Sequence, residues 1–138
     1  MDNTTILIDN FNIFDDWEDK YRYLIDLGNE LEPLSKDEYN EINKVDGCMS
    51  QVWLTHNFDE INNNLQFKGD SDALIVKGLI AVLLKLYNQK NPEQITELNI
   101  EEIFTKMGLN EHISPNRRNG FYAMVNKIKY FAQLYNNK

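Results

Sequence analysis

Residues 73–87 read ALIVKGLIAVLLKLY, and this stretch decides the fold. Apolar residues occupy nearly every position, so they surround a helix on almost every side instead of forming one stripe. A helix of this kind lies in the middle of a protein, with other elements packed around it. Its longest apolar run, 79–84, is far shorter than the roughly 20 residues that cross a bilayer. The sequence therefore predicts a soluble protein built around a central helix.

Two short runs before this helix are typical of β-strands. Residues 51–55 and 65–68 contain β-branched and aromatic side chains, and a turn-rich loop around 62–64 separates them. Because a hairpin of two strands is marginally stable alone, we expect a third strand near residues 43–46. Asp70, Ser71 and Asp72 are expected to cap the central helix.

Helix signals occur on both sides of this block. A capping box at Asp15 and Glu18 begins a helix that Gly28 is expected to end, and Ser35 with Glu38 predicts a short turn. Later helices are expected to begin at Asn91-Pro92, at Asn99 (closed by Gly108) and at Ser114-Pro115. This order predicts an α+β fold in which helices pack around a small antiparallel sheet of about three strands, as one domain over residues 1–138.

Charge is unevenly distributed along the chain, whose net charge is -8. Residues 1–72 contain 17 acidic and 5 basic residues, whereas 73–138 contain 5 and 9. An acidic half repels phosphate backbones, so we do not expect nucleic acid to bind. The acidic half is typical either of a surface that binds a partner protein with a basic patch or of a solvated surface without a partner.

The single cysteine, Cys48, excludes an internal disulfide and fits a reducing compartment. The N-terminus lacks the basic residues of a secretory signal, so a cytoplasmic location is expected. No metal site is expected, because His56 and His112 are isolated in the sequence from each other and from Cys48. Glycine-rich phosphate loops are also absent, and no cofactor is expected.

The residue types around Cys48 leave its role open between a buried core residue and a nucleophile. Gly47 permits a turn that another side chain would resist, which favours an accessible thiol. A hydrolase would need a base, and His56 would lie roughly 26 Å away along an extended strand. A thiol that carries sulfur needs only some thiolate and access to a partner.

Arg117 and Arg118 lie in the first turn of the last expected helix, where positive charge opposes the helix dipole. We expect either a specific role for them or a solvated surface pair. The carboxylate pairs of the chain are interpreted as helix caps and not as acid–base pairs.

Three blocks of sequence resemble the SufE family of sulfur acceptors. The first is residues 17–21 (WEDKY) with Leu27-Gly28 beyond it, and the second is residues 47–53 (GCMSQVW). The third is residues 69–73 (GDSDA) with residues 75–79 (IVKGL), followed by residues 112–117 (HISPNR) and Gly120. The resemblance covers about residues 14–132. It departs from the family pattern at Met49, where the family usually has glutamine, and no role is assigned to this residue.

This resemblance implies a carrier and not an independent enzyme. A SufS-like cysteine desulfurase, which uses pyridoxal phosphate, would pass persulfide sulfur to Cys48 and be stimulated by doing so. Cys48 would then hand the sulfur to a scaffold for iron–sulfur cluster assembly. The fold implied is similar to that of the scaffold proteins of the same pathway.

The same resemblance suggests supporting residues for Cys48. Arg117 is the candidate for a cation near the thiol or the partner, and Gln51 and Asp72 with Gly47 are candidates for shaping the loop. We also expect a partly shielded Cys48, because an exposed persulfide would be lost to other thiols. The alternatives are an interaction module that regulates the desulfurase without carrying sulfur, and a cysteine hydrolase.

Overall fold

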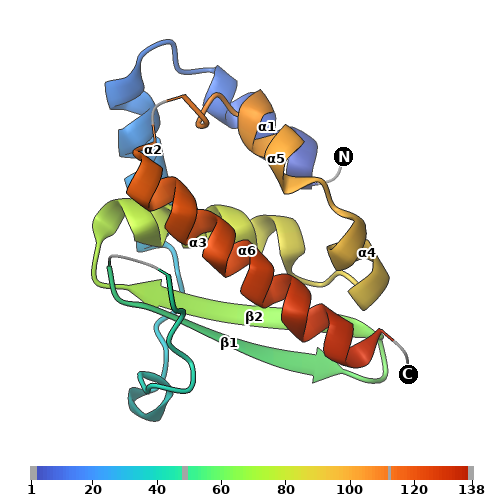
Figure 1. Ribbon diagram of the computed structural model, residues 1–138. Coiled ribbons are helices and arrows are strands. Elements are labelled where there is room, and N and C mark those ends of the chain that lie inside the picture. The colour runs from blue at the N-terminus through green and yellow to red at the C-terminus, as the bar shows by residue number, and fades with distance from the viewer. Residues whose placement is uncertain (1–2, 48–49, 112, 137–138) are drawn as a thin grey trace.

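The computed structural model describes residues 3–47, 50–111 and 113–136. Two helices begin the chain, a hairpin follows, and the remaining helices continue to the C-terminus (Figure 1). The elements are α1 (Asn3–Asn12), α2 (Trp17–Asn29), the 3-10 helix η1 (Lys36–Glu38), β1 (Val52–Asp59), β2 (Asn64–Ser71), α3 (Leu74–Tyr87), α4 (Pro92–Glu97), α5 (Ile100–Lys106) and α6 (Pro115–Tyr135). The predicted α+β class is confirmed.

The sheet has two antiparallel strands among the described residues, so the expectation of a third strand is wrong. The register runs from Val52 opposite Ser71 to Asp59 opposite Asn64. Residues 43–45 contribute only one isolated bridge, between Lys44 and Trp53. The ladder stops there because the backbone N–H of Asn43 donates to the side chain of Asn40 (2.8 Å), which turns the chain away from β1.

One face of the sheet is apolar and faces the helices. Val52 and Leu54 of β1 and Leu65 and Phe67 of β2 are buried, at alternate positions of each strand. Helix α3 contacts β2, and α6 contacts β1. Figure 1 shows α3 between the sheet and the layer formed by α1, α2 and α5, with α6 crossing the molecule diagonally. The expected central position of the 73–87 helix is confirmed.

Two glycines allow α2 and α3 to pack closely. An added Cβ on Gly28 would lie 2.7 Å from the backbone nitrogen of Gly78, and one on Gly78 would lie 2.3 Å from the carbonyl oxygen of Leu24. Gly28 is therefore inside α2, which continues to Asn29, and the expectation that it ends the helix is wrong. Its lack of a side chain serves the contact between helices.

The helix caps agree with the sequence in most places. Ser35, Asn91, Asn99 and Ser114 cap their elements as expected, and Gly108 (φ +75°) follows the end of α5. For α2 the cap is Asp16 and not Asp15.

The expected capping of α3 by the Asp-Ser-Asp stretch is mostly wrong. Its N-cap is Ala73, which has no side-chain cap. Only the Ser71 hydroxyl contributes, by accepting from the N–H of Ala73 (3.2 Å). The two aspartates bind other groups, described below.

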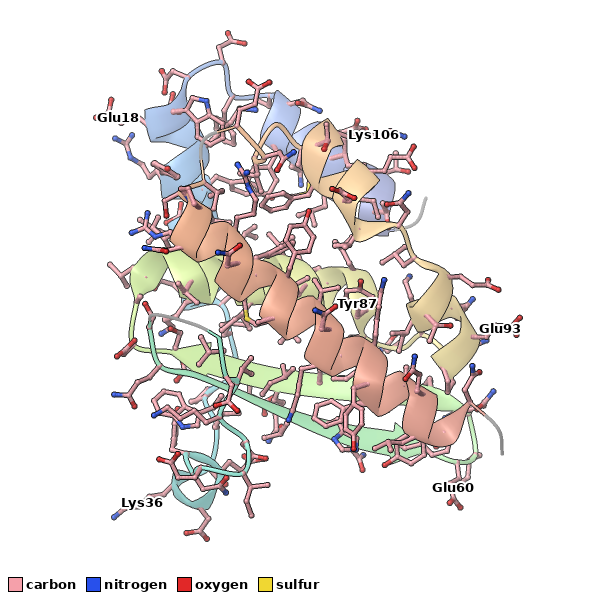
Figure 2. All side chains as sticks on the ribbon, viewed as in Figure 1. Glu18, Lys36, Glu60, Tyr87, Glu93 and Lys106 are labelled. Atoms are coloured by element: carbon pink, nitrogen blue, oxygen red, sulfur yellow. The ribbon has the colours of Figure 1, made fainter. Side chains whose placement is uncertain are left out.

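Helix α1 was not anticipated, and it adds Leu7 and Phe11 to the core. Tyr87, at the end of α3, is completely buried, and Figure 2 shows it in the interior beside α6. Its hydroxyl has no hydrogen-bond partner among the described residues. Within the same residues, no helix combines the length and apolar composition needed to span a bilayer.

Candidate functional site

A pocket of about 400 Å³ lies between the first turns of α3 and the first three turns of α6. Its apolar wall is formed by Val76, Leu79, Phe121 and Met124, and its polar side includes Ser50, Ser114, Asn116 and Arg117. The apolar wall exists because each helix places its buried face toward the other. The polar residues come from the loop before β1 and from the start of α6.

The loop that enters β1 lies against α6 on one of its described sides and lines the pocket on the other. Gly47 has φ of +90°, in the region that favours glycine, as the sequence predicted. A Cβ built on it would lie 3.5 Å from the Cβ of Ala123 in α6. Ser50, on the other side, lines the pocket itself. Cys48 and Met49 lie outside the described residues, so the role and the shielding expected for Cys48 stay predictions.

Gln51 and Asp72 meet where the hairpin opens. The backbone N–H of Gln51 donates to the Asp72 carboxylate (3.1 Å), and the N–H of Asp72 donates to the Gln51 carbonyl (3.3 Å). These bonds extend the strand pairing one step past Val52 and Ser71. The aspartate therefore fixes the main chain immediately after Ser50.

Arg117 and Arg118 have different surroundings. Arg117 is exposed at the pocket, and only its backbone N–H serves the cap of α6, by donating to the Ser114 hydroxyl (3.3 Å). The half-buried guanidinium of Arg118 donates to the carbonyls of Asn110 and Ile113. Arg118 thus holds the turn before α6, which leaves Arg117 as the arginine that faces the pocket.

His56 does not line this pocket. Its Nε2 is 3.0 Å from the hydroxyl of Tyr135, and its ring stacks on Phe131 with centroids 4.0 Å apart. Burial lowers the pKa of His56, and the nearby Lys127 lowers it further. Phe131 is 14 residues beyond Arg117 on α6, about 21 Å along the helix, and seven beyond Met124, about 10 Å, so His56 lies past the pocket toward the C-terminal end of α6. His112 is not among the described residues.

One polar cluster was not recognised in the sequence. Asp70 accepts a hydrogen bond from the Tyr39 hydroxyl (2.7 Å) and pairs with Lys77 (3.7 Å). Its partners are 31 and 7 residues away, so only the folded chain brings them together. Among the described residues, no three His, Cys, Asp or Glu side chains are grouped as they would be in a metal site.

Comparison with known protein families gives one match across most of the chain. The model of the SufE family, described as an Fe-S metabolism associated domain, matches residues 5–132. The matched range contains the loop at 47–50, both strands and all of the pocket residues.

Two curated relatives come from rhizobia. An uncharacterized SufE-like protein of Rhizobium etli is 47% identical over 130 residues, which cover 93% of this chain and 88% of the relative. Another from Rhizobium meliloti is 43% identical over 129 residues, covering 92% of each.

A solved structure also has a similar fold. The solution structure of a hypothetical protein from Thermus thermophilus matches with a TM-score of 0.80, covering 99% of this chain and 97% of that one. At 15% identity this match supports the fold alone.

Proposed function

The chain belongs to the SufE family, which is associated with iron–sulfur metabolism, and on that premise we propose that it carries sulfur on Cys48. The donor is a cysteine desulfurase that holds the sulfur as a persulfide, and the recipient is a scaffold on which clusters are built. The observation that carries this proposal is the match to the family over residues 5–132, in a chain whose only thiol is Cys48.

The transfer is a thiol exchange. The Cys48 thiolate attacks the outer sulfur of the desulfurase persulfide, and a new sulfur–sulfur bond forms on Cys48. The old bond breaks, and the desulfurase cysteine leaves as a thiolate. Atoms and electrons balance without an oxidant, and delivery to the scaffold is a second exchange of the same type. Removing its product persulfide in this way stimulates the desulfurase.

The described residues around Cys48 suit this chemistry. The pocket beside Ser50 has an apolar wall, which would keep water and other thiols from a persulfide, and Arg117 supplies a positive charge at its polar side. Asp72 fixes the backbone of Gln51, and Gly47 makes the turn before the thiol. We propose that these four residues shape the loop or face the desulfurase.

The test is incubation with a cysteine desulfurase and free cysteine, followed by intact mass measurement without reductant. The wild-type protein should gain the mass of one sulfur atom, and Cys48→Ser should gain none. Stimulation of the desulfurase, measured as alanine release, should be lost in the same variant. If Cys48→Ser stimulates the desulfurase fully, the chain is a regulatory module and not a carrier.

A further inference from the structure

Asp70, at the end of β2, joins three separate parts of the molecule. One carboxylate oxygen accepts from the Tyr39 hydroxyl (2.7 Å), and the other accepts from the N–H of Ser71 (2.8 Å) and pairs with Lys77 of α3 (3.7 Å). The side chain of Asp70 is 19% exposed, whereas Tyr39 is 38% exposed, so the carboxylate is the more shielded partner of this bond. The bond to Asp70 also raises the pKa of Tyr39.

The first of these parts leads into the Cys48 loop. Tyr39 follows η1, and its ring packs edge-on against Trp53 of β1 with centroids 5.1 Å apart. The chain then runs along β1, where the N–H of Val45 donates to the carbonyl of Val52 (2.8 Å), and reaches Gly47 two residues later. The bond from Tyr39 to Asp70 therefore anchors the segment that enters the loop.

The other two parts lead out of the loop and into the pocket wall. The residues after Asp70 include Asp72, whose carboxylate holds the N–H of Gln51 immediately after the loop. Lys77 belongs to the turn of α3 that contains Val76 and precedes Leu79, both of which line the pocket. Asp70 itself does not line the pocket, so any effect on its chemistry is indirect.

We propose that Asp70 is a positioning residue for sulfur transfer. Its carboxylate connects Tyr39, in the segment before the loop, to the end of β2, where Asp72 holds Gln51, and to Lys77 beside the pocket wall. This inference rests on the proposed function in taking Cys48 as the sulfur acceptor. It gives Asp70 a role different from helix capping.

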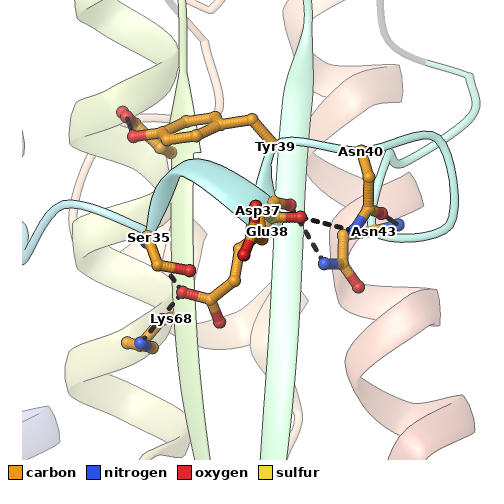
Figure 3. Close-up of polar contacts among 8 residues, drawn as sticks. Ser35, Asp37, Glu38, Tyr39, Asn40, Asn43 and Lys68 are labelled. Atoms are coloured by element: carbon orange, nitrogen blue, oxygen red, sulfur yellow. Dashed lines mark hydrogen bonds and ion pairs between the residues drawn. The ribbon is translucent and has the colours of Figure 1, made fainter.

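A neighbouring contact provides a matched control. Lys68, two residues before Asp70 on the same face of β2, pairs with Glu38 at 3.2 Å, and Figure 3 shows this contact beside Tyr39. It ties the same segment to the same strand, but it does not reach α3 or the main chain at 71–72. Lys68→Met therefore weakens the docking of the segment and leaves the link through Asp70 in place.

The experiment compares Asp70→Asn, Tyr39→Phe and Lys68→Met with the wild-type chain. Two quantities are measured: the rate of sulfur transfer from a persulfide-loaded desulfurase at increasing concentrations of this protein, and the rate of Cys48 alkylation by iodoacetamide across pH. Asp70→Asn and Tyr39→Phe should lower the maximal transfer rate about three- to tenfold. The half-saturating concentration should not change, and the pH profile of alkylation should shift. Lys68→Met should leave all three unchanged.

Urea unfolding of each variant separates positioning from stability. Tyr39→Phe keeps the ring against Trp53 and removes only the hydroxyl. It therefore tests the link between Tyr39 and Asp70 even where Asp70→Asn does not fold. The proposal is overturned if Tyr39→Phe transfers sulfur and alkylates like wild type, or if Lys68→Met slows transfer equally. Failure of the wild-type chain to accept sulfur would instead refute the proposed function, and alkylation would still test the link to the loop.

Discussion

Replacing Tyr87 with phenylalanine should stabilise the protein. The side chain is completely buried, and its hydroxyl has no hydrogen-bond partner among the described residues. An unsatisfied buried hydroxyl costs about 1 to 3 kcal/mol of the free energy of unfolding, and the small void left by its oxygen offsets part of the gain. Tyr87→Phe should therefore gain about 1 kcal/mol, or about 4 °C in melting temperature for a chain of this size.

The same substitution should alter stability at high pH. Burial raises the pKa of Tyr87 above its usual value of 10.0. Above about pH 10 the unfolded chain therefore loses the phenol proton while the folded chain keeps it, and the wild type loses stability as pH rises. Because phenylalanine does not titrate, the stability difference between variant and wild type should grow by about 1.4 kcal/mol between pH 8 and pH 11.

Urea unfolding followed by circular dichroism at both pH values measures these differences. The other tyrosines and the lysines titrate equally in both proteins, so the comparison isolates position 87. A variant that is less stable than wild type at pH 8 by about 1 kcal/mol would refute the reasoning, because the hydroxyl would then have to be hydrogen-bonded.

Three further substitutions test other contacts by urea unfolding. Gly78→Ala should lower the free energy of unfolding by about 3 kcal/mol, since the added Cβ would lie 2.3 Å from the carbonyl oxygen of Leu24. A loss below about 1 kcal/mol would show that α2 and α3 can separate easily. Arg118→Met should lower the free energy of unfolding by about 1 to 2 kcal/mol, because two loop carbonyls lose their donor. Arg117→Met, in the same turn, should lower it by less than about 0.5 kcal/mol. Equal losses would contradict the assignment of Arg118 to the loop carbonyls. Because the pKa of His56 is lowered in the folded chain, the unfolded chain takes up a proton below about pH 6.5 before the folded chain does. Acid should therefore destabilise the wild type more than His56→Gln. Identical losses of unfolding free energy in the two proteins between about pH 7.5 and 5 would contradict this.

Short-range signals in the sequence predicted most of the helices and both strands. The apolar stretch 73–87 correctly indicated a central helix, and Asn91, Asn99 and Ser114 correctly marked helix starts, because a cap depends on residues within one turn. Helix α1 carries no comparable signal and is held by packing of Leu7 and Phe11 against the core.

Two of the errors come from contacts between residues distant in the sequence. Gly28 has the spacing of a helix terminator, but its role is set by Gly78, fifty residues later. Asp70 precedes a helix and therefore has the pattern of a cap, whereas its side chain binds Tyr39 and Lys77. The missing third strand instead has a local cause, because the side chain of Asn40 accepts the N–H of Asn43 three residues later, which would otherwise have continued the ladder.

The candidate site was predictable in its residues more than in its arrangement. The resemblance to the SufE family suggested Gln51 and Asp72, and the structure shows that they meet through the main chain of one and the carboxylate of the other. The resemblance singled out Arg117, which faces the pocket, but the sequence did not reveal that Arg118 binds loop carbonyls, because adjacent arginines on a helix differ only in the direction of their side chains.

A single-turnover transfer tests the central claim most directly. A cysteine desulfurase is loaded with persulfide, freed of cysteine and mixed with an equal amount of this protein, and the peptides of both are then measured by mass spectrometry without reductant. The account predicts that the sulfur leaves the desulfurase and appears on the peptide that contains Cys48. Sulfur that stays on the desulfurase, or that reaches wild type and Cys48→Ser equally, would contradict it.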